Sequence, residues 1–160
     1  MLRLERIVSG GQTGADQAAL DVAMELGIPH GGWVPKGRKT ESGPLPAQYL
    51  LREMPTDSYA KRTEQNVMDS DGTLIISHGE LSEGSDYTRM MAAKHGKPWI
   101  HIDADKQSID VAVEMIRTWI SGNEIETLNV AGPPMSKDPL IYATAKMILK
   151  AVLFSTYEDL

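Results

Sequence analysis

Residues 9–16, SGGQTGAD, combine the features of an anion-binding loop with one feature that opposes it. Gly10, Gly11 and Gly14 allow the backbone to turn sharply and to approach a ligand without an intervening side chain. The helical pattern that begins after them would present free N–H groups and a positive dipole end, which favour phosphate or another oxyanion. Asp16 places a carboxylate beside that ligand. Its charge costs energy unless it meets a cation, a hydroxyl group or a nearby arginine.

Two common phosphate-binding motifs do not fit this loop. The loop of many nucleotide hydrolases ends in Gly-Lys-Ser/Thr, and this chain has Gly14-Ala15-Asp16 there. The dinucleotide motif G-x-G-x-x-G is missing only its first glycine, but it also needs an acid about 20 residues further on to bind a ribose. The chain has Lys36 and Arg38 in that region. Basic residues suit an additional phosphate, so a nicotinamide-dependent dehydrogenase is disfavoured.

A second glycine-rich turn, containing Gly84 and Ser85, precedes another helical segment. It could repeat the arrangement of the first turn, or Ser85 or Asp86 could simply cap the helix. Arg62 stands at the start of a further predicted helix. Its guanidinium could bind an oxyanion through two hydrogen bonds, or it could form a surface ion pair. Both turns and Arg62 therefore become candidates for one anion site.

Other chemistries lack the residues that they need. The chain has no cysteine, which excludes disulfides, thiolate nucleophiles and thiolate metal sites. The four histidines are scattered without metal-ligand spacing, so we expect them to be structural or exposed and predict no metal site. Ser9 does not lie in the G-x-S-x-G pattern of a serine hydrolase.

The composition is that of one ordinary globular domain, which we expect to span residues 1–160. Hydrophobic residues make up 41% and charged residues 24% of the chain. The net charge of −6 argues against bulk attraction to nucleic acid or to anionic membranes. No apolar run approaches the length of a membrane span, and nothing resembles a signal peptide. These features predict a soluble cytoplasmic protein.

The elements that must position these residues alternate between strands and helices. Apolar runs predict strands over residues 4–9, 32–35, 73–77, 99–102 and 127–131. Helical spacing predicts helices over residues 15–26, 58–68 and 109–120, a helix that Gly96 ends, and a last helix that follows Asp138-Pro139. Residues 36–56 are rich in proline and lack periodicity, which predicts a long ordered loop that covers something.

This alternation predicts an α/β fold, with about five parallel strands and helices on both faces. Such sheets bind ligands beyond the carboxyl ends of their strands, where the strand order reverses. With the strand order 2-1-3-4-5, that point lies between the first and third strands. Because the two glycine-rich turns follow those two strands, this order predicts a single shared site.

Four segments resemble the "putative molybdenum carrier" family, a circularly permuted branch of the SLOG superfamily: SGGQTGADQAALDVAMELGI, GGWVPKGRKTESGPLP, YAKRTEQNVMDSDGTLII and KHGKPWIHID. The resemblance extends over nearly the whole chain. It implies a three-layer Rossmann-like sandwich, homo-oligomeric assembly as a dimer or tetramer, and binding of molybdenum cofactor, which is a phosphorylated pterin. It also implies kinship with nucleotide-cleaving proteins, including the lonely-guy phosphoribohydrolases.

The motifs and the resemblance together predict the residues that bind the ligand and its phosphate. They are Gly10, Gly11, Gln12, Thr13, Gly14, Asp16, Lys36, Arg38, Arg62, Asn66, Gly84 and Ser85. The chain departs from the family pattern in the second turn, which lacks a Gly-Gly-Thr sequence, and near Val34, where relatives often carry a cysteine. The acid that serves as catalyst in the lonely-guy enzymes has Thr88 as its counterpart here.

Three functions remain open on this evidence. The favoured one is a binding protein for a phosphorylated heterocycle, either molybdenum cofactor or a nucleotide, without direct contact between protein and metal. The second is a nucleotide-processing enzyme related to the lonely-guy phosphoribohydrolases, with Asp16 as the candidate catalytic residue. The third is a non-catalytic nucleotide-sensing adaptor domain, since a fold alone does not determine a function.

Overall fold

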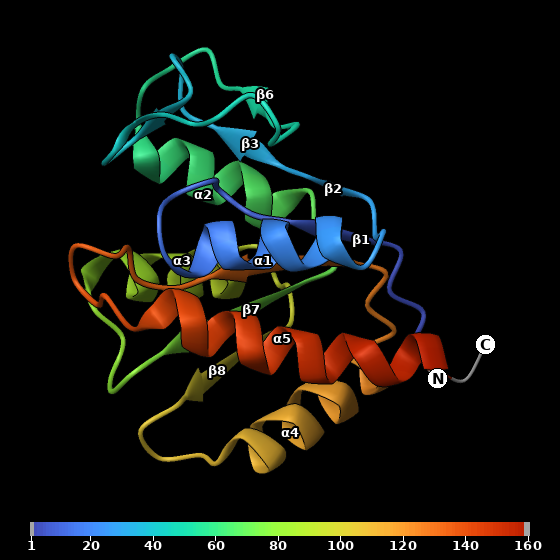
Figure 1. The fold of residues 1–160 in the computed structure, drawn as a ribbon. Helices are drawn as coiled ribbons and strands as arrows, with labels where there is room; N and C mark the ends of the chain where they lie inside the picture. The colour runs from blue at the N-terminus through green and yellow to red at the C-terminus, as the bar shows by residue number, and fades with distance from the viewer. Residues whose placement is uncertain (1, 159–160) are drawn as a thin grey trace.

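A five-stranded parallel sheet forms the centre of the protein, which the computed structural model describes for residues 2–158, with side chains as far as Phe154 (Figure 1). The sheet consists of β1 (Arg6–Val8), β2 (His30–Gly31), β7 (Gly72–Ser77), β8 (Trp99–Asp103) and β9 (Thr127–Ala131). The helices are α1 (Ala15–Glu25), α2 (Tyr59–Met68), α3 (Glu83–Lys94), α4 (Ile109–Gly122) and α5 (Ile141–Glu158). The predicted three-layer α/β sandwich is confirmed.

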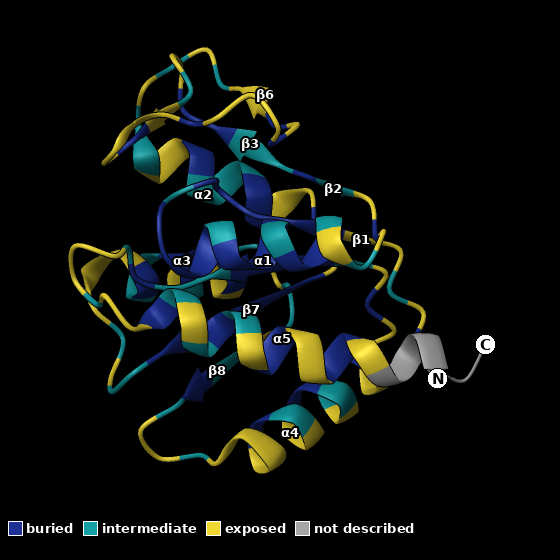
Figure 2. Ribbon diagram, viewed as in Figure 1, coloured by how far each residue is buried: buried dark blue, intermediate teal, exposed yellow. Residues whose placement is uncertain are grey.

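Helices cover both faces of the sheet. On one face α5 packs between α1 and α4, and on the other face α2 packs beside α3 (Figure 1). Side chains alternate between the faces along each strand. Leu128 and Val130 of β9 therefore enter the large apolar core beneath α1, α4 and α5, whereas Asn129 between them belongs to neither apolar cluster. Buried residues recur along the helices, between exposed ones (Figure 2). No helix within residues 2–158 combines the length and apolar character needed to cross a membrane.

The strand order is β2-β1-β9-β7-β8, so the predicted order 2-1-3-4-5 is wrong. The last strand, β9, inserts between the first and third strands, where Asn129 pairs in register with Val8 on one side and with Thr73 on the other. An apolar strand pattern reports burial but not the identity of the neighbouring strand. The order depends on the packing of α5 between α1 and α4, which draws β9 to the middle of the sheet.

The second predicted strand, residues 32–35, is displaced in the structure. The strand that joins the main sheet is β2, while β3 (Trp33–Val34) pairs with β6 (Arg52–Glu53) in a separate two-stranded sheet. Gly32 separates β2 from β3 with a φ of 118°, and a Cβ atom there would lie 2.3 Å from the carbonyl oxygen of Ser9. Only glycine allows the chain to turn away from the main sheet so close to β1.

The proline-rich segment is ordered, as predicted, but it contains short strands. A small antiparallel hairpin joins β4 (Lys39–Thr40) to β5 (Gly43–Pro44). Beneath it, Leu45, Tyr49 and Leu51 form a second apolar cluster with Leu20 of α1 and with Val34. The segment is therefore fastened to α1 by buried apolar side chains, each of which contributes about 1.5–3 kcal/mol when fully buried.

Candidate functional site

A cavity of about 420 Å³ opens between α2 and α3 at the carboxyl ends of β1, β9 and β7. Its volume lies in the range of small-molecule sites. Seven of the predicted residues line it: Gly10, Gln12, Asp16, Arg62, Asn66, Gly84 and Ser85. The two glycine-rich turns thus share one cavity even though β9 separates their strands.

Five predicted residues do not line this cavity. In the first turn, residues 9–16, Gly11 faces Leu45, and Gly14 lies so close to the loop after β9 that a Cβ atom would be 2.4 Å from the carbonyl oxygen of Pro133. The hydroxyl group of Thr13 donates a hydrogen bond to Glu41. These three residues hold the turn in place. A substitution at Gly11 would therefore test loop packing, and only indirectly ligand binding.

Lys36 and Arg38 lie in the proline-rich segment, away from the cavity lining. The Lys36 side chain is exposed. The guanidinium of Arg38 donates hydrogen bonds to backbone carbonyl oxygens of the same segment, at 2.7 Å to Tyr49, 2.8 Å to Pro46 and 3.0 Å to Leu45. Arg38 therefore organises the loop. The basic residues that suggested a second phosphate site do not reach the cavity in this structure.

The first turn is occupied by its own side chains. The backbone N–H of Gln12 donates to Oδ2 of Asp16 at 3.2 Å, and the N–H of Gly11 donates to the Ser9 hydroxyl at 3.3 Å. The N–H of Thr13 donates to the side-chain oxygen of Gln12 at 3.0 Å. The carboxylate of Asp16 thus occupies the place at the helix N-terminus that a bound anion would take.

Asp16 is a buried carboxyl group on the cavity wall, with 7% of its surface exposed. Burial raises its pKa to about 6, against the opposing effects of the Arg62 charge and of hydrogen bonds from the backbone of Gln12 and Gly10. Arg62 is also buried, donates to the carbonyl oxygen of Gly10, and lies 5.4 Å from the centre of the Tyr59 ring. Burial lowers the pKa of Arg62, but an arginine remains cationic at neutral pH.

The second turn, residues 82–85, is open at the N-terminus of α3. Ser82 has an extended backbone but makes no capping hydrogen bond, unlike Ser58 of α2 and Ser108 of α4, which accept from N–H groups at 3.2 and 3.3 Å. Within the described part of the chain, no protein acceptor pairs with the N–H groups of Glu83, Gly84 and Ser85. Unpaired N–H groups at a helix N-terminus favour an anion.

The side chain of Ser85 strengthens this feature. It is 4% exposed, it lines the cavity, and its hydroxyl group has no hydrogen-bond partner among the described residues. A buried hydroxyl normally finds a partner, because leaving it unpaired costs free energy. The hydroxyl and the three N–H groups together make one compact cluster of unused donors. This cluster is the part of the cavity best suited to a phosphate or another oxyanion.

A third loop, residues 132–137 after β9, completes the rim and was missed by the sequence analysis. It brings Lys137 to the cavity, where no carboxylate within the described residues pairs with its ammonium group. The loop is fastened at Ser136, whose hydroxyl group donates to Glu41 at 2.5 Å. The backbone N–H of Met135 donates to the Thr13 hydroxyl at 3.1 Å. Glu41 therefore ties the rim loop and the first turn to the proline-rich hairpin.

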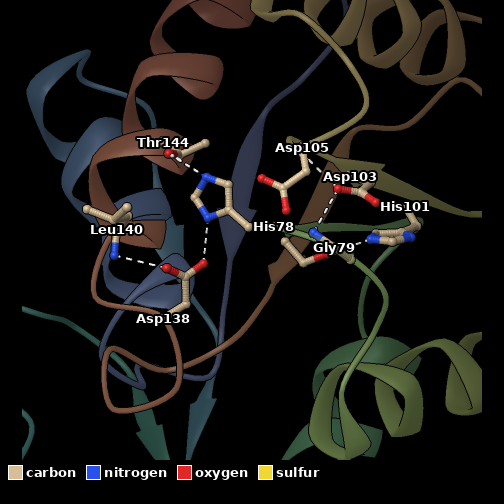
Figure 3. Close-up of polar contacts among 9 residues, drawn as sticks. His78, Gly79, His101, Asp103, Asp105, Asp138, Leu140 and Thr144 are labelled. Carbon is tan, nitrogen blue, oxygen red and sulfur yellow. Dashed lines mark hydrogen bonds and ion pairs between the residues drawn. The ribbon is translucent and has the colours of Figure 1, made fainter.

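Two histidines, His78 directly after β7 and His101 in the middle of β8, form hydrogen bonds near the carboxyl end of β7 (Figure 3). Nδ1 of His78 lies 2.5 Å from Asp138, and its Nε2 lies 3.1 Å from the Thr144 hydroxyl, which fixes the end of the rim loop. Nε2 of His101 lies 2.7 Å from the Ser77 hydroxyl. These two histidines have structural roles, as predicted. No group of three or more metal-ligating side chains occurs within the residues that the structure describes.

Two tyrosines and Asn129 supply further walls and were also missed. Tyr59 and Tyr87 line the cavity from α2 and α3. Asn129 is 3% exposed and lines it from β9, with its amide group donating to the Thr73 hydroxyl at 3.2 Å. The amide of Asn66 instead accepts from the N–H of Trp33 at 2.8 Å and donates to its carbonyl oxygen at 3.0 Å. An asparagine inside the apolar run TLNVA was the available signal, because a buried polar residue in a central strand calls for an explanation.

The cavity therefore presents donors at one end, acceptors on its wall and aromatic rings at its sides. The donors include the second turn, Lys137 and the guanidinium of Arg62 beside Asp16, and the acceptors include Asp16 and Asn129. Among the described lining residues there is no histidine or cysteine that could serve as a base or nucleophile. The arrangement suits recognition of a ring that carries an anionic group.

Comparison with known proteins agrees with this architecture. The model of the circularly permutated YpsA SLOG family matches residues 7–153. The crystal structure of Putative molybdenum carrier protein from Syntrophus aciditrophicus SB is similar to this chain, with 53% sequence identity and a TM-score of 0.94. The match covers 95% of this chain and 96% of that one. Comparison with curated proteins gave no match.

Proposed function

The chain belongs to the circularly permutated YpsA SLOG family, and from this premise we propose that its cavity binds a phosphorylated heterocycle and carries it unchanged. The name of the similar structure, a molybdenum carrier protein, makes molybdenum cofactor one candidate ligand. A nucleotide is the other candidate, because it combines the same two chemical parts, a flat heterocycle and a phosphate. The observation that carries the proposal is the set of unpaired N–H groups at the N-terminus of α3.

The phosphate of the ligand would bind at the second turn. Three backbone N–H groups and the Ser85 hydroxyl can donate to its oxygen atoms, and the dipole of the twelve-residue helix α3 favours negative charge there. Lys137 on the rim adds a positive charge that attracts the ligand and is screened by salt. Glu83 opposes binding through its own negative charge, but its side chain is exposed.

The ring of the ligand would lie deeper, between α2 and α3. Tyr59 and Tyr87 offer aromatic faces or edges on two sides of the cavity. The Tyr59 ring also lies 4.4 Å from the ammonium group of Lys39 and near the guanidinium of Arg62. These cations hold Tyr59 in place. A flat, polarisable ring is the ligand shape that such walls accept.

Carriage without cleavage follows from the scarcity of acid–base groups. Cleavage of a nucleotide needs a positioned acid or base within hydrogen-bond reach of the reacting atoms. The raised pKa of Asp16 is the one observation that favours a nucleotide-processing enzyme. Its carboxylate, however, already accepts from the backbone of its own turn. Incubation with a nucleotide followed by mass spectrometry should return the ligand intact, and a released base would instead support the enzyme.

A pair of substitutions at Glu83 tests the phosphate site. Glu83 is the first residue of α3 and follows the extended Ser82, so proline fits there without disturbing the helix. Glu83→Pro removes one N–H donor together with the side-chain charge, whereas Glu83→Ala removes the charge alone. Calorimetry with adenosine 5′-monophosphate should show about tenfold weaker binding for Glu83→Pro than for Glu83→Ala. Equal affinities for the two variants would contradict the proposed phosphate site.

Assembly and location stay predictions. A dimer or tetramer is implied by the family resemblance. Met147 and Phe154 of α5 are 54% and 53% exposed, and Leu140, directly before α5 and seven residues before Met147, is 68% exposed. Such a spacing places them along one side of the helix, where a second copy of the chain could cover them. A cytoplasmic location is consistent with the composition.

A further inference from the structure

We propose that Asp16 is the residue that selects the ring of the ligand, by accepting hydrogen bonds from adjacent N–H groups on the edge of the ring. The preferred ring is thus one with an amino–amide edge, such as guanine, and rings with an acceptor at that edge bind more weakly. The inference rests on the proposed function, because it assumes a phosphorylated heterocycle in the cavity. It assigns a role to the one acidic residue of the first turn.

The charge of Asp16 excludes an anion from its end of the cavity. The carboxylate already occupies the N-terminus of α1 and accepts from the N–H of Gln12 at 3.2 Å. A phosphate placed beside it would meet a buried like charge, and Arg62, the cation that faces this carboxylate, already donates to the carbonyl oxygen of Gly10. The phosphate must therefore bind at the second turn, and the opposite end of the ligand faces Asp16.

The same carboxylate retains room for donors from a ligand. An ionised carboxylate has about four acceptor positions, and the backbone N–H groups of Gln12 and Gly10 supply donors to it, with the Gln12 bond to Oδ2 at 3.2 Å. The charge of Arg62 lowers the pKa of this carboxyl group, while its guanidinium donates a hydrogen bond to the carbonyl oxygen of Gly10. A buried carboxylate gains most from donors that replace lost water. Two adjacent N–H groups on a ring are well matched to its two oxygen atoms.

Asn129 adds a second buried acceptor to this part of the cavity. Its amide group donates to Thr73, while no described residue donates to its side-chain oxygen. The residue lies in the middle of the central strand β9, in register with Val8 and Thr73, so its position is rigid. The Asp16 carboxylate and the side-chain oxygen of Asn129 can both accept further hydrogen bonds. The ring edge that fits beside them is therefore one that carries donors. A ring that presented acceptors there would leave Asp16 and Asn129 unpaired, and that loss carries a larger cost than a missing methylene group.

The test compares three nucleotides that share ribose and phosphate. Guanosine 5′-monophosphate has two adjacent donor groups, inosine 5′-monophosphate lacks the amino group, and adenosine 5′-monophosphate has an acceptor in place of the ring N–H. Calorimetry at pH 7.5 should rank them in that order, with guanosine 5′-monophosphate binding about tenfold or more tightly than adenosine 5′-monophosphate. In Asp16→Asn this preference should fall to within about twofold.

Asp110→Asn is the matched control. Asp110 is the second residue of α4, as Asp16 is the second residue of α1, but it is exposed and does not line the cavity. This variant removes one carboxylate from a helix N-terminus and should keep the full preference for guanosine 5′-monophosphate. A preference that persists unchanged in Asp16→Asn would overturn the inference.

The pH dependence provides a second measurement on the unaltered protein. The ratio of the two affinities, guanosine over adenosine 5′-monophosphate, should fall as the pH is lowered through about 6, because Asp16 becomes protonated. Arg62, the cation that faces the carboxylate, stays charged over this range, and both nucleotides carry the same phosphate. A ratio independent of pH would count against Asp16.

The outcomes separate this inference from the proposed function. If adenosine 5′-monophosphate binds as tightly as guanosine 5′-monophosphate and the Glu83 variants behave as expected, the phosphate site stands and the assignment of Asp16 fails. If the protein binds none of the three nucleotides, the proposed function fails in its nucleotide form, and the selectivity assigned to Asp16 fails with it.

Discussion

At the N-terminus of α1, the first turn engages its backbone N–H groups with side chains of the same segment, whereas at the N-terminus of α3 the second turn leaves its N–H groups open to the cavity. Both turns contain glycine and both connect a strand to a helix at the same edge of the sheet. The difference lies in the acceptors that each segment carries: Ser9, Gln12 and Asp16 serve the first turn, and nothing comparable serves the second.

This contrast shows that a glycine-rich turn does not by itself bind an anion. The first turn is a preformed, internally satisfied wall, since its carboxylate has taken the position of the anion. In the second turn, the N–H groups of residues 83–85 have no acceptor among the described residues, so a ligand that accepts hydrogen bonds from them can stabilise the turn. A rigid wall beside an open donor cluster gives a cavity two ends of opposite polarity, and that polarity orients the ligand.

Alanine at one glycine of each turn should separate the two turns most strongly. Gly14 has a φ of 83° and almost no space for a Cβ atom, whereas Gly84 is helical and has no atom within 4 Å of that position. We expect Gly14→Ala to lower the free energy of unfolding by about 3 kcal/mol or more. Gly84→Ala should raise it by about 0.5 kcal/mol, because alanine favours a helix. Urea unfolding measures both, and equal effects would show that the turns are equally packed.

Removing the charge of Asp16 should stabilise the protein without ligand. Burial raises its pKa from an ordinary 3.8 to about 6 in the folded state, so the folded state binds more protons than the unfolded state between these values. The unaltered protein therefore loses stability as the pH rises through this window. The free energy of unfolding of Asp16→Asn should exceed that of the unaltered protein by on the order of 2 kcal/mol above about pH 6, and by little below about pH 4.

Unfolding of Asp16→Asn at pH 4 and pH 8, with Asp110→Asn as the control, checks this sign. A loss of stability at pH 8 would mean that the carboxylate mainly serves the fold through its bond to Gln12. Higher stability of Asp16→Asn at pH 8 would show that the Asp16 carboxylate lowers the stability of the fold. Such a cost is expected of a residue that is retained for binding.

The smallest expected effect concerns the rim of the second turn. Lys137→Gln should weaken binding of inorganic phosphate about threefold at low salt and by less at high salt, since the lysine is exposed. Lys97→Gln removes the same charge outside the cavity lining and should leave the affinity unchanged. If both substitutions weaken binding equally, Lys137 acts through the overall charge of the protein and makes no local contact.

Much of the fold could be predicted because it depends on local patterns. The apolar runs at β7 and β9 and the periodicity of α1 and α4 are properties of neighbouring residues, and all four elements form close to where they were expected. The strand order could not be predicted, because residues of β9 meet β1 and β7 only through the long-range packing of α5. The displaced second strand has a similar cause, since the bend at Gly32 depends on its distance from Ser9.

The candidate site divides in the same way. Glycine, aspartate and arginine residues with motif-like spacing pointed to Gly10, Asp16, Arg62 and Ser85, and these do line the cavity. Lys36 and Arg38 followed from a spacing rule for another fold, and the structure uses Arg38 to organise a loop. Lys137 belongs to no recognisable motif. Its place on the rim depends on the contact of Ser136 with Glu41 and of Asp138 with His78.

By itself, the sequence determined the alternation of elements, the two glycine turns and the presence of an acid in the first of them, because backbone freedom and side-chain charge are properties of the residues alone. Only the tertiary structure decided which turn is open. Whether an N–H group is free depends on the acceptors that folding brings within about 3 Å of it, and such distances are set by packing. The segment SGGQTGAD resembles an anion-binding loop except for its acidic residue. In the folded protein, the carboxylate of that residue, Asp16, itself occupies the anion position and accepts from the N–H of Gln12.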